Sequence, residues 1–311
     1  MSKICVIGGA NIDICGTSTL PLREYDSNPG HIEMRYGGVG RNIAQTLLRM
    51  GQNVEFVTSF ADDDFGHQLK KDCENLGLDC KKSKVVSNVP SSIYLAVMDS
   101  DGDMYVAVND MRILETLDEN DLKQAIEDLN EDDLLVLDAN LSEEKLEYLA
   151  SNAKCLKAAD PVSASKCKRL LNSLGYLDIF KPNRYEAEEF TGIKIINEKT
   201  ASQSLDWFLE KGVKEILISM ADKGVLLGTK EGKYWFTHRT IHLDNATGGG
   251  DSFLGGYLSQ RLLKSTPYDS VKFAISAAVT TIESSNQERR NLDFNAIQNA
   301  IIDMEIKEKR I

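Results

Sequence analysis

The sequence predicts an α/β protein built on a mostly parallel sheet, because strand-like and helix-like segments alternate over most of its 311 residues. One strand-like segment, residues 133–139, has a continuous apolar centre, as in strands that are buried on both faces of a parallel sheet. In such folds ligands bind at the carboxyl ends of the strands. The length suits one large domain with at most a small appendage.

The expected elements follow one another from the N-terminus. The first strand is expected at Ile4–Gly8, and the first helix at Val39–Met50, where apolar residues recur at helical spacing until Gly51 ends the helix. Further strands are expected at 54–59, 133–139, 154–159, 177–181 and 215–219, with helices at 65–76, 163–174, 184–191 and 198–211 and another after Ser142. Three helices are expected towards the C-terminus, over 249–263, 268–284 and 294–307.

Two stretches interrupt this alternation. Residues 15–36 contain two prolines and show no helical period, and residues 91–108 have the pattern of a β-hairpin that turns at Asp101-Gly102. Strands that lie outside the alternation predict a small antiparallel sheet beside the main domain. A pair of decorated loops is the alternative interpretation.

Composition narrows the class of partner. Thirty-six Lys and Arg against 48 Asp and Glu give a net charge of −12, which disfavours nucleic acid and membrane surfaces. None of the six cysteines forms a C-x-x-C pair, so we expect reduced thiols. The N-terminus has no signal-peptide layout, and no apolar run approaches the roughly 18 residues of a membrane span. We therefore expect a cytoplasmic protein that binds a small molecule.

The densest functional signal is the turn Gly248-Gly249-Gly250-Asp251, which opens an expected helix. Successive glycines let backbone N–H groups turn towards one point, and the positive end of the helix adds to them. Such a cradle holds an anion or stabilises the negative charge that develops on phosphate oxygens. Asp251 at its edge either caps the helix or takes a proton from a nucleophile. A Walker-A site is excluded, because the chain has no G-x-x-x-x-G-K-[ST] sequence.

A second glycine turn precedes the helix at 39–50. It contains Gly38 and is followed by Asn42, while Asn11 and Asp13 stand after the first strand. Carboxylate and amide side chains that converge over a glycine turn are suited to binding vicinal hydroxyls. Capping of loops is the alternative interpretation.

Two more clusters follow later strands. Asn183 and Glu186 lie three residues apart, so they share one face of a first helical turn and are able to hold waters around Mg²⁺. A simple helix N-terminus is the alternative. The loop from Ser219 to Gly224 follows the next strand and is expected on the nucleotide side of the site.

In sequence order, four motifs together resemble the ribokinase-like (PfkB) carbohydrate kinase family across the whole chain: Asn11-x-Asp13, Gly37-Gly38 with Asn42, Asn183-x-x-Glu186, and the turn Thr247-Gly248-x-Gly250-Asp251. The resemblance implies a Rossmann-type three-layer α/β/α core with a mostly parallel sheet, a small β-sheet lid over the sugar, and the use of ATP and Mg²⁺. The lid would comprise residues 15–36 and 89–113, and the core residues 1–14, 37–88 and 114–311. A nucleoside or sugar substrate and a homodimer formed through the lid are also implied.

The resemblance implies a role for each site residue. Asp251 would be the general base, and the N–H groups of the three preceding glycines would form the anion hole for the transferred phosphoryl group. Ribose hydroxyls would be bound by Asn11, Asp13, Gly38 and Asn42. The nucleotide would be held by Asn183, Glu186, Ser219, Gly224, Thr247, Ala277 and Ala278, the first two also organising Mg²⁺ through water.

Within the family, segments such as Asp26–Gly30 and Asp160–Ala164 resemble the pseudouridine kinase branch, which implies phosphorylation of the nucleoside 5′-hydroxyl. The residues expected to read the base are Ser27, Asn109, Asp110 and Lys166. Other kinases of the family, acting on ribose, fructose or adenosine, are alternatives, and so is a non-catalytic sugar or nucleoside sensor.

Two positions depart from the family pattern. Gly249 replaces the alanine that the family usually carries in the glycine turn, which removes no N–H donor. Asn245 stands where many ribokinases have an acidic residue near a monovalent-cation site, so the resemblance leaves dependence on K⁺ open.

Overall fold

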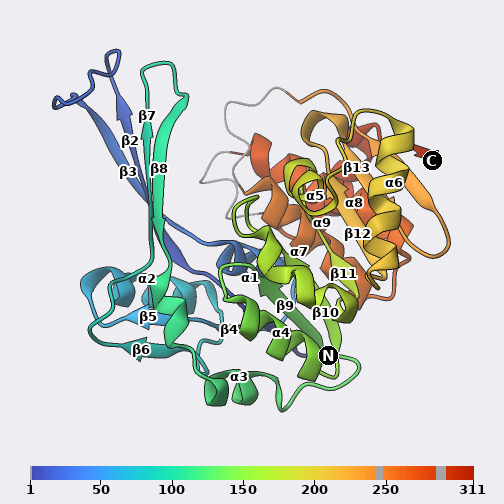
Figure 1. The fold of residues 1–311 in the computed structure, drawn as a ribbon, viewed down its shortest axis with the longest axis horizontal. Helices are drawn as coiled ribbons and strands as arrows, with labels where there is room; N and C mark the ends of the chain where they lie inside the picture. The colour runs from blue at the N-terminus through green and yellow to red at the C-terminus, as the bar shows by residue number, and fades with distance from the viewer. Residues whose placement is uncertain (1, 242–247, 285–291) are drawn as a thin grey trace.

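A computed structural model describes residues 2–241, 248–284 and 292–311, and its centre is a nine-stranded sheet in the order β15-β14-β13-β12-β11-β10-β9-β1-β4 (Figure 1). Its strands are β1 (Ile4–Ile7), β4 (Val54–Val57), β9 (Leu134–Asp138), β10 (Leu156–Asp160), β11 (Ile179–Phe180), β12 (Glu215–Ser219), β13 (Val225–Gly228), β14 (Lys233–Thr237) and β15 (Lys307–Arg310). The pairs from β4 to β12 are parallel, and those from β12 to β15 are antiparallel. The predicted mostly parallel α/β sheet is confirmed.

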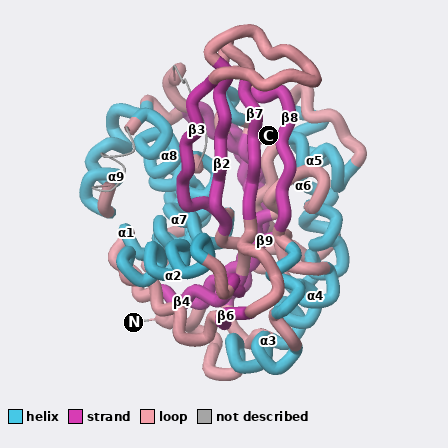
Figure 2. Tube along the Cα trace, turned by 90° about the vertical axis from the view of Figure 1, so that its left-hand side faces the viewer, coloured by secondary structure: helices cyan, strands magenta, loops and turns pink. Residues whose placement is uncertain are grey.

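Helices cover both faces of this sheet (Figure 2). They are α1 (Val39–Arg49), α2 (Asp64–Leu76), α3 (Glu119–Ile126), α4 (Glu143–Asn152), α5 (Arg184–Thr191), α6 (Glu198–Glu210), α7 (Gly249–Leu262), α8 (Pro267–Glu283) and α9 (Phe294–Ala300), with 3-10 turns η1 (Arg112–Thr116), η2 (Cys167–Tyr176), η3 (Ala221–Lys223) and η5 (Ile301–Met304). Strand β1 faces two hydrophobic cores, since Cys5 and Ile7 pack with α3 to α6 and Ile4 and Val6 with α1, α7 and α8. Among the described residues, no helix is long and apolar enough to cross a membrane.

The C-terminal segment differs from its prediction. A helix was expected over 294–307, but α9 ends at Ala300 and the chain then forms β15, antiparallel to β14. The strand reads Lys-Glu-Lys-Arg and is exposed along its length, so it carries neither apolar alternation nor a buried face for a sequence pattern to reveal. Charged side chains are typical of edge strands, where they discourage pairing with other chains.

The two stretches that interrupt the strand–helix alternation form a second, four-stranded sheet in the order β3-β2-β7-β8. This sheet stands away from the core helices (Figures 1 and 2). Its strands are β2 (Asn11–Ser18), β3 (Gly30–Gly37), β7 (Ile93–Met98) and β8 (Met104–Asp110). The predicted hairpin is confirmed, with Gly102 at a φ of +86° in the β7–β8 turn. The sheet is mixed rather than antiparallel, because β2 and β7 pair in parallel. A short pair, β5 (Ser59–Ala61) and β6 (Lys84–Val86), lies apart from both sheets.

Candidate active site

The candidate site lies where the parallel strands end. β9 ends at Asp138 and β10 at Asp160, while Lys181 and Asn183 come directly after β11. β1 leads into a glycine pair and then into Asn11 at the start of β2. Because parallel strands deliver their carboxyl ends to one edge, chemically active side chains from distant parts of the sequence meet there.

A buried carboxylate holds the loops of this edge together. Asp138 is fully buried and accepts backbone N–H bonds from Gly9 (2.8 Å), Gly40 (2.7 Å) and Asn140 (2.9 Å). A Cβ at Gly8 would lie 2.5 Å from the Asp138 carboxylate, so the close approach requires glycine. Burial raises the pKa of Asp138, and the three N–H bonds oppose that rise. Asp138 belongs to none of the motifs from which the site was predicted.

The predicted hydroxyl-binding residues lie together beside that carboxylate. Asn11 donates its amide N–H to Asp13 at 2.5 Å. Gly38 has a φ of +103°, and a Cβ there would lie 2.4 Å from the Gly9 carbonyl oxygen. Burial raises the pKa of Asp13, whereas the Asn11 hydrogen bond and Arg41 counteract it. The result is a polar corner of hydrogen-bond acceptors and donors beside the Gly8-Gly9 turn and the Gly37-Gly38 turn.

Asn42 connects this corner to the helix that follows the glycine cradle. Its side-chain N–H donates to the Asp251 carboxylate at 2.8 Å across 209 positions of sequence. Helix α1 packs against α7 closely enough that a Cβ at Gly255 would lie 2.6 Å from the Thr46 methyl carbon. Small residues where α1 and α7 cross therefore bring Asn42, one of the predicted hydroxyl-binding residues, into contact with Asp251, the predicted general base.

The N-terminus of α7 has the geometry of an anion site. Gly248 is the N-cap, at a φ of +84°, and the first hydrogen bond of the helix runs from the Ser252 N–H to its carbonyl oxygen. The N–H groups of Gly249, Gly250 and Asp251 precede that bond and have no carbonyl partner within the helix. Asp251 is the third helical residue and does not cap the helix, which removes the alternative interpretation. Thr247 lies outside the described residues.

A buried ion pair lies beside the cradle. The Lys181 ammonium group donates to Asp160 at 2.8 Å, and a Cβ at Gly250 would lie 3.0 Å from its Nζ. Burial, followed by the charge of Asp160, raises the pKa of Asp251 to about 7, while Asn42 and Lys181 act in the opposite direction.

Asn183 and Glu186 form a reciprocal cap at the start of α5. The Asn183 N–H donates to the Glu186 carboxylate at 2.7 Å, and the Glu186 N–H donates to the Asn183 side-chain oxygen at 2.9 Å. Glu186 is buried, and desolvation with the charge of Asp160 raises its pKa to about 7. No cluster of three or more His, Cys, Asp or Glu side chains suited to a metal exists within the described ranges. The reciprocal cap is the helix N-terminus of the alternative interpretation, and the Mg²⁺ role of these two oxygen-bearing side chains stays a prediction.

The residues predicted to read a base are only partly brought together. Lys166 is half-buried and donates to Asn109 at 3.2 Å and to Asn140 at 2.8 Å. Asp110 is held by Arg112 in an ion pair of 2.6 Å. Ser27 is exposed in the loop between β2 and β3, beyond the far end of an eight-residue strand, which spans roughly 25 Å.

The predicted nucleotide residues occupy two places. Ser219 forms a backbone bridge to Asn183, and Gly224, at a φ of +90°, has the Phe236 carbonyl oxygen 1.9 Å from where a Cβ would lie. Ala277 is fully buried against α7, with its Cβ 2.8 Å from a Cβ placed at Gly256. Ala278 is only partly buried, so it is the better placed of the two alanines to face a ligand.

An α/β core with an anion cradle and a hydroxyl-binding corner defines a class of enzyme that transfers a phosphoryl group to a small alcohol. The model of the pfkB family carbohydrate kinases matches residues 1–292. This chain belongs to that family.

Similar proteins include two nucleoside kinases. Pseudouridine kinase from Escherichia coli K12 is 34% identical over 274 residues, 87% of each chain, and guanosine-inosine kinase from Exiguobacterium acetylicum is 27% identical over 92% of this chain and 96% of its own. The Arabidopsis thaliana ribokinase structure with ribose and ATP has a TM-score of 0.83 at 19% identity, covering 97% of this chain and 99% of that one, which is a likeness of fold.

The three hydrogen bonds that Asp138 accepts predict that its substitution lowers the stability of the protein. Asp138→Asn replaces one acceptor oxygen with an N–H group that faces backbone donors, so we expect the free energy of unfolding to fall by about 2–3 kcal/mol. Urea denaturation of the purified protein measures this. Asp110→Asn, which removes an ion pair at the surface and keeps an amide oxygen for the Arg112 N–H, is the control and should cost under about 1 kcal/mol. Equal losses in the two variants would contradict the central role of Asp138.

Proposed function

We propose that this chain is an ATP-dependent kinase that phosphorylates the 5′-hydroxyl of pseudouridine to give pseudouridine 5′-phosphate, in nucleoside salvage or catabolism in the cytoplasm. The observation that carries the phosphotransfer is the hydrogen bond from Asn42 to Asp251, which joins the hydroxyl-binding corner to the anion cradle. The choice of pseudouridine rests on the motifs described above and on the resemblance to a pseudouridine kinase at 34% identity.

Asp251 acts as the general base. The Asn42 hydrogen bond orients the Asp251 carboxylate towards the corner where Asp13 and Asn11 hold the ribose 2′- and 3′-hydroxyls. Its raised pKa, about 7, suits proton transfer near neutral pH, because a base works best when its pKa lies close to the working pH. Proton removal from the 5′-hydroxyl leaves an oxygen ready to attack the phosphoryl group.

The three glycines stabilise the phosphoryl group during transfer. The N–H groups of Gly249 and Gly250, at the positive end of α7, would donate to its oxygens, with Gly248 completing the anion hole. Mg²⁺ bound to ATP supplies charge neutralisation at the phosphates. Asn183 and Glu186 would hold that ion through water, and Ser219, Gly224, Thr247 and Ala278 would line the nucleotide side. Positioning and charge stabilisation supply most of the rate enhancement in such reactions.

Recognition of the nucleobase is assigned to the side of the hydroxyl-binding corner where Lys166 and Asn109 lie. Lys166 and Asn109 present a donor and an amide beside Asn140, and Asp110 and Ser27 would approach as the lid closes. Pseudouridine is joined to ribose through carbon, so its uracil offers a ring N–H that uridine lacks. A buried acceptor left unpaired costs about 1–3 kcal/mol, which would disfavour uridine roughly tenfold to a hundredfold.

The lid would comprise residues 15–36 and 89–113, with the rest of the chain as core. Apolar side chains are exposed on this sheet, among them Ile32 (76%) and Val108 (66%), which supports a homodimer formed through it. All six cysteines lie within the described residues and none is in a disulfide, which supports a cytoplasmic location.

A non-catalytic sensor is the competing class of function. A sensor has no use for a carboxylate of raised pKa beside an anion cradle, so Asp251 favours the enzyme. Kinases for ribose, fructose or adenosine are competitors within the family, since they share the cradle and the hydroxyl corner.

Replacing Asp251, the proposed general base, tests the mechanism. We expect Asp251→Asn to fold normally and to bind nucleotide, but to lose a factor of roughly 10²–10⁴ in kcat, the usual contribution of a general base. Steady-state kinetics measure kcat, and circular dichroism confirms folding. Turnover like that of the unaltered enzyme would reduce Asp251 to a structural residue.

Lid closure predicts a change in backbone protection. We expect amides in 15–36 and 89–113 to exchange more slowly with pseudouridine and a non-hydrolysable ATP analogue present, because closure excludes water from the transferred group. Hydrogen exchange followed by mass spectrometry measures this, with the core strands as internal reference. Unchanged exchange in both segments would rule out a lid.

The substrate assignment is tested by kcat/KM for pseudouridine, uridine, adenosine, ribose and fructose under one set of conditions. We expect pseudouridine to lead uridine by at least about tenfold and free ribose to be poor. A preference for any of the other four would move the chain to a neighbouring branch while leaving the mechanism intact. If none of the five compounds stimulates ATP consumption, the result would support the non-catalytic sensor.

A further inference from the structure

Two cysteine thiols lie together on the far side of Arg41 from the candidate site. Cys73 is fully buried in the last turns of α2, and Cys80 follows the helix end, where Gly77 at a φ of +95° reverses the chain. The Leu78 N–H bonds back to the Cys73 carbonyl oxygen at 3.1 Å. This reversal returns the chain to the end of the helix, so Cys73 and Cys80 lie in one buried cluster, and each thiol shifts the pKa of the other.

The charges around the pair favour a thiolate at Cys73. The Cys80 hydrogen bond, followed by Arg41, lowers the pKa of Cys73 against the opposing effects of burial and of Asp72. The pKa of Cys80 is raised, by the same hydrogen bond, by burial and by the nearby carboxylates of Glu74 and Asp79. Of the two groups, Cys80 therefore holds the proton and donates it towards Cys73. Thiolate character and proximity to a second thiol are the features of redox-active cysteines.

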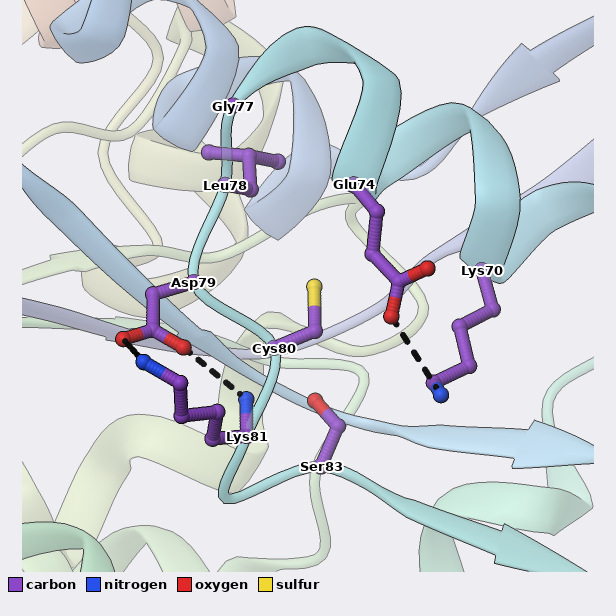
Figure 3. Close-up of a pocket in the computed structure, with 8 residues that line it drawn as sticks. All are labelled: Lys70, Glu74, Gly77, Leu78, Asp79, Cys80, Lys81 and Ser83. Carbon is purple, nitrogen blue, oxygen red and sulfur yellow. Dashed lines mark hydrogen bonds and ion pairs between the residues drawn. The ribbon is translucent and has the colours of Figure 1, made fainter.

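A cavity of about 510 Å³ gives access to Cys80, whereas Cys73 is fully buried behind it and does not line the cavity. Figure 3 shows the Cys80 sulfur facing into this space, between the helix that carries Lys70 and Glu74 and the turn at Asp79. The charged lining is internally paired, with Lys70 to Glu74 at 3.3 Å and Lys81 to Asp79 at 3.0 Å. A small neutral or zwitterionic disulfide would meet no unpaired charge on its way to the sulfur.

We propose that Cys73 and Cys80 form a reversible disulfide, with a low-molecular-weight disulfide as the oxidant. The Cys73 thiolate accepts the proton of Cys80 while the Cys80 sulfur attacks one sulfur of the small disulfide, which forms a mixed disulfide and expels one small thiolate. Cys73 then loses its proton and attacks the Cys80 sulfur, which breaks the mixed disulfide and expels the second small thiolate. The protein thiols lose two electrons and two protons, and the small disulfide becomes two thiols.

Arg41 connects this pair to the candidate site. The buried guanidinium of Arg41 contacts Cys73, pairs with Asp72, and donates to the Asn42 side-chain oxygen at 3.3 Å and to the Tyr36 carbonyl oxygen at 3.2 Å. A disulfide removes the negative charge on the Cys73 sulfur, so the Arg41 guanidinium interacts more strongly with its other partners. Asn42 and the end of β3 then change position, which weakens substrate binding; this consequence rests on the proposed function.

The experiment uses the whole protein in buffers of defined cysteine to cystine ratio, because cystine is a small zwitterionic disulfide. Peptide mass spectrometry after alkylation locates any disulfide, and kinetics with pseudouridine follow in the same samples. We expect a Cys73–Cys80 link and a rise in the nucleoside KM of about fivefold or more, both reversed by dithiothreitol. Cys73→Ser and Cys80→Ser should lose the link and keep a constant KM, with Cys80→Ala as a second variant if Cys80→Ser unfolds.

The readouts separate the two claims. Cys15, a half-buried thiol on β2, is the internal comparison. If Cys15 alone is modified, or if Cys73 and Cys80 both remain alkylatable in the most oxidising buffer, the disulfide proposal is overturned. A link without a change in KM overturns the coupling through Arg41. Absence of kinase activity in the reduced protein would count against the proposed function and leaves the mass-spectrometric test of the disulfide intact.

Discussion

The buried carboxylate of Asp138 is the constraint on which the candidate site depends. It accepts N–H bonds from the loops that follow β1 and β9 and from the first turn of α1, so it sets the positions of the Gly8-Gly9 turn and of the Gly37-Gly38 turn. Without it, three buried donors would lack partners at the edge of the sheet where ligands bind. Asn11 and Gly38 take their places from this arrangement, because each lies within two residues of a loop that Asp138 holds.

A second constraint is electrostatic. Asp160, Glu186 and Asp251 influence one another around the single ammonium group of Lys181, and burial raises the pKa of both Glu186 and Asp251 to about 7. A group of carboxylates that shares one buried cation is poised to accept further positive charge. Under the proposed function, the Mg²⁺ ion that accompanies the nucleotide would supply such charge.

Local patterns predicted the fold and the main clusters, while pairings over long distance escaped them. The order of the clusters predicted that Asn42 and Asp251 serve one site, and they form a hydrogen bond across 209 positions. Asp138 escaped notice because a lone aspartate after an apolar strand has no local signature, and its partners Gly9 and Gly40 lie 129 and 98 positions away. β15 was missed for a related reason, since its partner β14 is distant and its own residues are all charged.

The pH dependence of kcat/KM tests the central claim, that Asn42 holds Asp251 as an ionised base, most directly. A base acts when ionised, so kcat/KM should fall below pH 7, the approximate pKa of Asp251. The Asn42 hydrogen bond lowers that pKa, so Asn42→Ala should move the acidic limb to higher pH by about one unit, whereas Asn109→Ala should leave it in place. An acidic limb that Asn42→Ala leaves unmoved, or moves to lower pH, would contradict the account.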